Sequence, residues 1–63
     1  MEDYQQRVVD EKTELDGKIE RLNSFFSNPK FRELPPDEQD RMTRQCQAMI
    51  EYTGILAERI AAF

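Results

Sequence analysis

Histidine and tryptophan are absent from this 63-residue chain, which has only one cysteine, two glycines and three prolines. Without histidine, neither a Ser-His-Asp triad nor a Cys-His pair can form. A lone cysteine makes neither an internal disulfide nor a cysteine-pair zinc site, and two separate glycines make no glycine-rich phosphate loop. We therefore expect a protein that is not an enzyme and that holds no metal or other cofactor.

Long apolar runs and an excess of positive charge are also missing. The apolar runs fall far short of the ~20 residues of a membrane span, and the amino terminus is acidic where a signal peptide would be basic. Thirteen acidic against nine basic residues give a net charge of -4, which argues against general binding to DNA or RNA. We expect a soluble, cytoplasmic protein, with a local pocket for a small anion left open.

Two groups of residues allow more than one interpretation. Cys46 is expected to be a small buried hydrophobe in a reducing compartment, and a reactive nucleophile is the alternative. Asp37, Glu38 and Asp40 stand where a helix is expected to begin, and acidic residues there complement the helix dipole. A magnesium site is the alternative for these carboxylates.

Two apolar stripes organise the chain. The stripe in the second half recurs at steps of four and three and consists of Met42, Cys46, Met49, Thr53, Leu56, Ile60 and Phe63. The stripe in the first half is interrupted at Lys12 and consists of Tyr4, Val8, Leu15, Ile19, Leu22 and Phe26. Such spacings place their members on one face of an α-helix. The sequence thus predicts two amphipathic helices that cover each other.

Prolines mark the connection between these helices. We predict an all-α fold, an antiparallel two-helix hairpin formed as one domain over residues 1–63. Its parts are a helix over 2–27, a short helical turn over 29–34 and a helix over 36–62. In the predicted register Leu15 is level with Thr53. The closed end should be filled by Phe25, Phe26, Phe31 and Leu34.

The second helix has more apolar surface than one partner helix can cover. The surplus stands on two sides of its stripe, at Ala48, Tyr52 and Ile55 and at Ile50, Ala57 and Ala61. A chain this short also buries only about 60% of the surface it exposes when unfolded. We expect the hairpins to assemble into a homo-oligomeric helical bundle, from a dimer to a hexamer.

Basic and aromatic positions are the candidate binding residues. Guanidinium groups bind phosphate with two hydrogen bonds, and tyrosine rings stack on bases. The candidates for a ligand-binding site between subunits are Tyr4, Arg7, Lys18, Arg21, Arg41, Arg44, Tyr52 and Arg59. The alternative is that the charged side chains only keep the helix surfaces solvated, and that the tyrosines only pack in the core or in an interface.

The overall pattern of the chain also carries a family resemblance. Its main elements are the run Tyr4-Gln5-Gln6-Arg7-Val8-Val9-Asp10-Glu11-Lys12, then Leu34-Pro35, Ala48-Met49, Tyr52 and Glu58-Arg59-Ile60. In these residues, nearly the whole chain resembles small uncharacterised proteins of tailed bacteriophages, including crAss-like phages. More loosely, the hairpin with its proline-led second helix is similar to phage anti-CBASS and anti-Thoeris sponge proteins.

That second resemblance implies a function. The sponges assemble into oligomers and sequester cyclic oligonucleotide or related nucleotide signals of bacterial immunity without degrading them. It therefore implies an anti-defence sponge in the cytoplasm of an infected bacterium, with a small anionic nucleotide as its partner. The chain has no clear counterpart of the sponges' amino-terminal extension, so no site residue is transferred. The alternative is a helical protein-protein interaction module that docks on a host or phage protein through its surplus apolar face.

Overall fold

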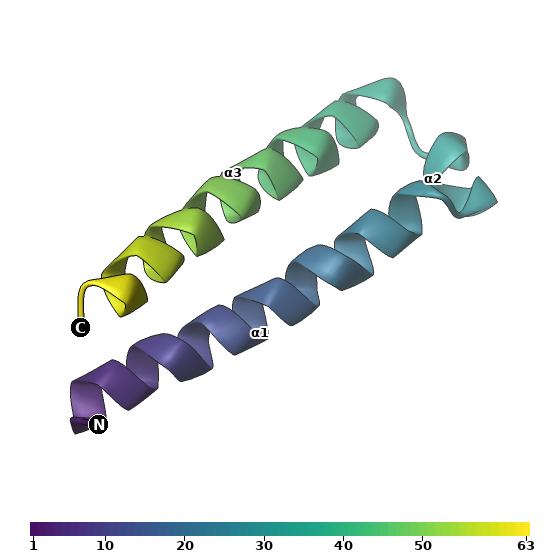
Figure 1. Ribbon diagram of the computed structural model, residues 1–63. Helices are drawn as coiled ribbons and strands as arrows, with labels where there is room; N and C mark the ends of the chain where they lie inside the picture. Colours follow the sequence, from purple (N-terminus) through teal and green to yellow (C-terminus); the bar gives the residue numbers. More distant parts are fainter.

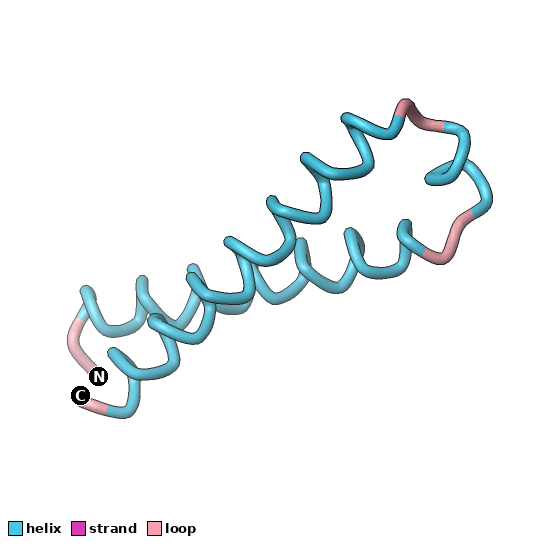
Figure 2. The backbone as a smooth tube through the Cα atoms, turned by 90° about the horizontal axis from the view of Figure 1, so that it is seen from above, coloured by secondary structure: helices cyan, strands magenta, loops and turns pink.

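The computed structural model describes residues 1–63, and it is all-helical, as the sequence predicts. Two long helices, α1 (Asp3–Phe26) and α3 (Pro36–Ala61), lie side by side and run in opposite directions (Figure 1). The short helix α2 (Pro29–Glu33) lies in the connection at one end, and both chain termini lie at the other (Figure 2). The molecule is a rod that measures 45 × 15 × 13 Å. None of the three helices combines the length and the hydropathy that a membrane crossing requires.

Side chains near the first turns set where the helices begin. The backbone N–H of Glu2 donates to Gln5 Oε1 at 2.9 Å, which satisfies a donor ahead of α1. Asn28 Oδ1 accepts the backbone N–H of Lys30 at 2.9 Å, so Asn28 caps α2. Pro29 then occupies the first position of α2, where its missing N–H has no cost. Two residues, Ser27 and Asn28, thus separate the end of α1 from the start of α2.

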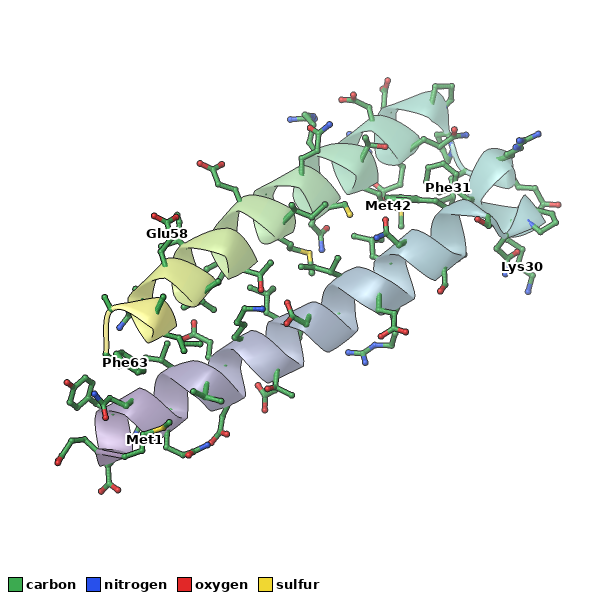
Figure 3. All side chains as sticks on the ribbon, viewed as in Figure 1. Met1, Lys30, Phe31, Met42, Glu58 and Phe63 are labelled. Atoms are coloured by element: carbon green, nitrogen blue, oxygen red, sulfur yellow. The ribbon has the colours of Figure 1, made fainter.

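Aromatic rings fill the closed end of the molecule. The Phe31 ring lies edge-on to the rings of Phe26 and Phe25, at centroid distances of 4.9 and 6.0 Å. Figure 3 shows Phe31 where α2 joins the long helices. The side-chain amide of Gln39 donates to the backbone carbonyl of Leu34 at 2.8 Å and so ties the connection to α3. These ring contacts confirm the predicted role of the phenylalanines.

The core is a thin line along the contact between α1 and α3. Val8 and Leu15 of α1 are buried against Leu56 of α3, whose side chain is only 1% exposed. Half-buried apolar residues extend this line on both helices, among them Ile19 and Ile60. Only four of the 63 residues are buried, so the pair of helices has little interior of its own.

Two polar contacts show the register of the long helices. The Thr53 hydroxyl donates to Asp16 Oδ1, and Cys46 Sγ lies 3.6 Å from Asn23 Oδ1. Thr53 is therefore level with Asp16, one residue from Leu15, which the sequence places opposite Thr53. The same register extends to the ends of the chain, where the rings of Tyr4 and Phe63 contact each other, because each step along α1 is matched by an equal step along α3 in the opposite direction.

Candidate functional site

The apolar seam divides the surface of the helix pair into two flanks. Asp16 and Thr53 bond across the seam on one side, which we call the Thr53 flank. An α-helix advances by about 100° per residue, so Lys18 of α1 and Tyr52 of α3 fall on the other side of the seam. We call this side the Tyr52 flank. The side chains of Lys18 and Tyr52 are both exposed there.

Three of the eight candidate residues lie at similar levels along the rod, near its middle. Because Asp16 is level with Thr53, Lys18 lies within one helical turn of Tyr52 along the rod. Arg21 follows Lys18 by three residues on the same side of α1. Neither basic side chain makes an ion pair within the chain. We call Lys18, Arg21 and Tyr52 the middle group.

Gly17 allows the side chain of Arg21 to lie close to the backbone of α1. A Cβ atom at Gly17 would lie 3.3 Å from Arg21 Nη1, which is closer than ordinary van der Waals contact. The guanidinium group of Arg21 is therefore folded back along α1, over Gly17. Gly17 follows the buried Leu15 by two residues, so this guanidinium lies on the face of α1 that is turned away from α3. The glycine, unfavourable inside a helix, gives this guanidinium room beside the backbone.

Three further candidates lie at the open end, where the termini meet. The rings of Tyr4 and Phe63 contact edge-on at a centroid distance of 6.0 Å, and Figure 3 shows Phe63 at the end of the molecule that holds Met1. Arg7 lies one turn after Tyr4, and Arg59 lies one turn before Phe63. The side chains of these two arginines are exposed and make no ion pair within the chain.

The last two candidates are already paired within α3. Arg41 Nε lies 2.9 Å from Glu38 Oε1, and Arg44 Nε lies 2.9 Å from Asp40 Oδ2. All four side chains are substantially exposed, so each pair stabilises the helix by only about 0.3–0.5 kcal/mol. Glu38 and Asp40 are thus partners of arginines, and no group of three metal-binding side chains occurs in the structure.

A single chain does not bring the eight candidates into one place. Arg7 and Lys18 are eleven residues apart on α1, which corresponds to roughly 16 Å along the helix axis. The arginines of the first turns of α3 lie still further away, towards the closed end. No pocket is present in the single chain. The candidates therefore form separate exposed groups along the rod.

A polar cluster at the edge of the seam was not predicted from the sequence. Lys12 Nζ lies 2.8 Å from Asp16 Oδ2, and the Thr53 hydroxyl donates to the other oxygen of the same carboxylate. The hydrogen bond from Lys12 and then that from Thr53 hold the pKa of Asp16 below its ordinary value of 3.8. The four-residue spacing of Lys12 and Asp16 was the available signal. The sequence offered no such signal for Thr53, because Thr53 occupies a position of the apolar stripe.

Cys46 is buried in the seam, as expected for a thiol that packs as a small apolar group. Its sulfur atom lies 3.6 Å from Asn23 Oδ1, and only 4% of the residue is exposed. Burial of this degree keeps oxidants and electrophiles in the solvent away from the sulfur. Cys46 is therefore part of the packing between α1 and α3.

Comparison with known proteins identifies the family. The family model described as Sequestin matches residues 2–62. The chain is also 37% identical over 60 residues to an uncharacterised 7.5 kDa protein from the denB-rIIB intergenic region of Enterobacteria phage T4, which covers 95% of this chain and 94% of that protein. No solved structure matches the chain. With nearly its whole length matched, the chain belongs to the Sequestin family, a family of small phage proteins.

Proposed function

We propose that the protein is a phage anti-defence sponge that binds and sequesters a cyclic oligonucleotide or a related nucleotide signal of bacterial immunity, without catalysis. The observation that carries the proposal is the middle group, two unpaired basic side chains on α1 near the level of an exposed tyrosine on α3. The name Sequestin agrees with a protein that acts by sequestration. A sponge needs affinity and no turnover, so a chain without histidine can perform this function.

Each member of the middle group has a role that suits such a ligand. Lys18 and Arg21 supply positive charge and N–H donors for phosphate oxygens. The Tyr52 ring is 44% exposed and offers an apolar face on which a nucleobase stacks. Tyr4 and Arg7 provide the same combination at the open end, where the Tyr4 ring is 59% exposed. Bound phosphate also offsets part of the repulsion between neighbouring basic groups.

The proposal places the ligand between copies of the chain. The side chains of the middle group stand on an exposed surface, so walls for a ligand come from a second subunit. The accessible surface of 4899 Å² exceeds the about 4,200 Å² of a compact monomer of this mass. Likewise, the radius of gyration of 14.5 Å exceeds the about 10.6 Å of a compact 63-residue domain. Association would cover part of this surplus and enclose the ligand.

Thermal unfolding with a panel of cyclic di- and trinucleotides tests this function. A ligand that binds only the folded form, at 100 times its Kd, stabilises it by about 2.7 kcal/mol. For a domain of this size the midpoint should then rise by about 10 °C or more. The double variant Lys18→Ala, Arg21→Ala should lose the shift.

A charge-matched control separates the site from general electrostatics. The double variant Lys30→Ala, Arg32→Ala also removes two exposed positive charges, but from α2 at the closed end, where Figure 3 shows Lys30. This variant should keep the full midpoint shift. A shift that survives in the double variant Lys18→Ala, Arg21→Ala would move the ligand away from these two residues. A panel in which no cyclic nucleotide shifts the wild-type protein, extended to related nucleotides with the same result, would reject the sponge.

A protein-protein interaction module is the second candidate, favoured by the apolar residues of the Thr53 flank. Ile50 is 51% exposed, and the exposed alanines Ala57 and Ala61 continue its side of α3. A helix or strand of a host or phage protein could pack there. A flat nucleotide panel, together with loss of partner capture in Ile50→Asp, would support this function instead.

A further inference from the structure

One row of side chains on α3 has the charge pattern of a self-complementary surface. Glu51, Ile55 and Arg59 follow each other at steps of four, so they lie along one ridge of the helix with the isoleucine in the middle. Ile55 is 49% exposed, and Glu51 and Arg59 are exposed on either side of it. The ridge runs along the side of α3 that turns away from α1, near Glu58, which points away from α1 in Figure 3.

Neither charge of the ridge has a partner within the chain. The three ion pairs of the molecule join other residues. Glu51 and Arg59 cannot pair with each other, because eight residues separate them by about 12 Å along the helix. The acid and the base are therefore both available to a second molecule, at a fixed spacing on either side of an apolar side chain.

We propose that this ridge is a two-fold interface between two copies of the chain, with the symmetry axis passing beside Ile55. The two α3 helices then run in opposite directions, and Ile55 meets the partner's Ile55. Glu51 faces the partner's Arg59, and the same pair forms again on the other side of the axis. This inference rests on the assembly that the proposed function requires, and it names the surface that forms it.

The residues one turn further out fit the same arrangement. Ala48 lies seven residues before Ile55 and Ala62 lies seven residues after it, so each alanine meets the partner's other alanine. Small side chains at these points let the two helices approach closely. Both alanines are exposed in the single chain. Apolar contact at the centre and at both flanking points, with opposite charges between them, makes the ridge complementary to itself.

Other placements of the same two helices are less favourable. A parallel arrangement in register would set Glu51 against the partner's Glu51 and Arg59 against the partner's Arg59. An antiparallel arrangement with the axis moved by one turn towards the amino end of α3 would bring Arg44 opposite the partner's Arg59. Like charges in direct contact disfavour both arrangements. Of these three arrangements, the charge pattern favours the one with the axis beside Ile55.

Under this proposal Arg59 belongs to the subunit contact, whereas Lys18 and Arg21 remain exposed beside it. A second copy on the ridge extends the surface next to Tyr52, which precedes Ile55 by three residues. The nucleotide would then bind at the edge of the interface. In this way the two-fold contact supplies the wall that the middle group lacks in a single chain.

A charge-reversal and mixing experiment tests the interface, and it contains no nucleotide. In Arg59→Glu the interface would carry acid against acid, and in Glu51→Arg it would carry base against base. Sedimentation equilibrium should show each variant to self-associate about tenfold more weakly than the wild type. An equimolar mixture should recover wild-type affinity, because each heterodimer again pairs opposite charges at both sites. Circular dichroism of each variant checks that the helices are intact.

Glu20→Arg is the matched control, because it changes the net charge as Glu51→Arg does but lies on α1, away from the ridge. It should associate like the wild type and should not rescue Arg59→Glu. The proposed interface would be overturned if the single variants associated as tightly as the wild type. It would also be overturned if the mixture associated no more tightly than each variant alone. Since association is measured without ligand, this failure is distinct from a flat nucleotide panel, which rejects only the sponge.

Discussion

Asp16 makes one of the two polar contacts between the long helices, at the edge of the apolar seam. Its carboxylate binds Lys12 of the same helix and the hydroxyl of Thr53 from α3. If α3 slid along α1 by one turn, Thr53 would lose this acceptor and an apolar residue would face the charged pair. Polar groups in a helical seam favour the one register in which they are satisfied. We therefore expect the cluster to specify how α1 and α3 align.

The contribution of Thr53 can be measured through the pKa of Asp16. Hydrogen bonds from Lys12 and Thr53 lower this pKa, so Thr53→Val should raise it towards 3.8. An NMR titration of the carboxyl carbon measures the change. Thr43→Val is the control, because the Thr43 hydroxyl donates to the backbone carbonyl of Gln39 and not to Asp16. An unchanged pKa in Thr53→Val would show that the hydroxyl does not act on the carboxylate.

The direction of the pKa shift also sets the pH dependence of stability. The folded-state pKa of Asp16 lies below its unfolded value, so the unfolded state binds the proton more tightly. Asp16 thus stabilises the fold above its ordinary pKa of 3.8, and this contribution is lost as the pH falls through the lower folded-state value. In Asp16→Asn the urea midpoint should fall less between pH 6 and pH 3 than in the wild type.

At the scale of elements, the stability of the rod depends on a narrow line of contacts between α1 and α3. Leu56 is the most deeply buried side chain, and it packs against Val8 and Leu15. The other long side chains along the seam are only partly covered. Neither long helix would be stable alone in water without this contact, since helical stability in proteins comes mainly from packing of the apolar face.

Truncating the Leu56 side chain should therefore lower the free energy of unfolding severely. A Leu→Ala change in a core costs about 2–5 kcal/mol, against a total stability of about 3–9 kcal/mol for a chain of this length. Urea unfolding followed by circular dichroism should show most of the stability lost in Leu56→Ala. Ile50→Ala removes a side chain of the same kind from a half-exposed position of the same helix and should cost much less. Equal losses of unfolding free energy in the two variants would show that Leu56 is not a centre of the core.

For the whole molecule, the central feature is the excess of surface over interior. A rod 45 Å long with four buried residues exposes apolar side chains on both flanks of its seam. Such a chain gains stability when copies of it cover those flanks. The proposed sponge and the proposed two-fold interface both depend on this gain.

Association predicts that stability depends on protein concentration. If the folded chain assembles and the unfolded chain does not, the thermal midpoint should rise with concentration by mass action. Calorimetry over a hundredfold range of concentration measures this shift. Arg59→Glu should show a smaller dependence than the wild type. A midpoint independent of concentration, together with the mass of a single chain in sedimentation, would contradict assembly.

The elements of the fold were predictable because they depend on local chemistry. The stripes from Tyr4 to Phe26 and from Met42 to Phe63 are periodic in sequence, and the Asn28-Pro29 and Leu34-Pro35-Pro36 segments break the helices. The phenylalanines at the closed end were predictable for the same reason, since they flank the connection. The grouping of the candidate site residues was harder to predict from the sequence. Arg44 and Lys18 appear equivalent as basic residues in sequence, and only side-chain contacts separate the paired arginine from the free lysine.

By itself, the sequence determined two amphipathic helices, the proline-marked turn between them and the absence of histidine-based chemistry. The tertiary structure alone decided that Lys12, Asp16 and Thr53 form one cluster, and that Lys18 and Tyr52 stand on the opposite flank. The physical reason is the range of the interactions. Helix periodicity and proline breaks act over a few neighbouring residues, whereas a contact such as Asp16 with Thr53 joins positions 37 residues apart, and its geometry exists only after the helices have packed.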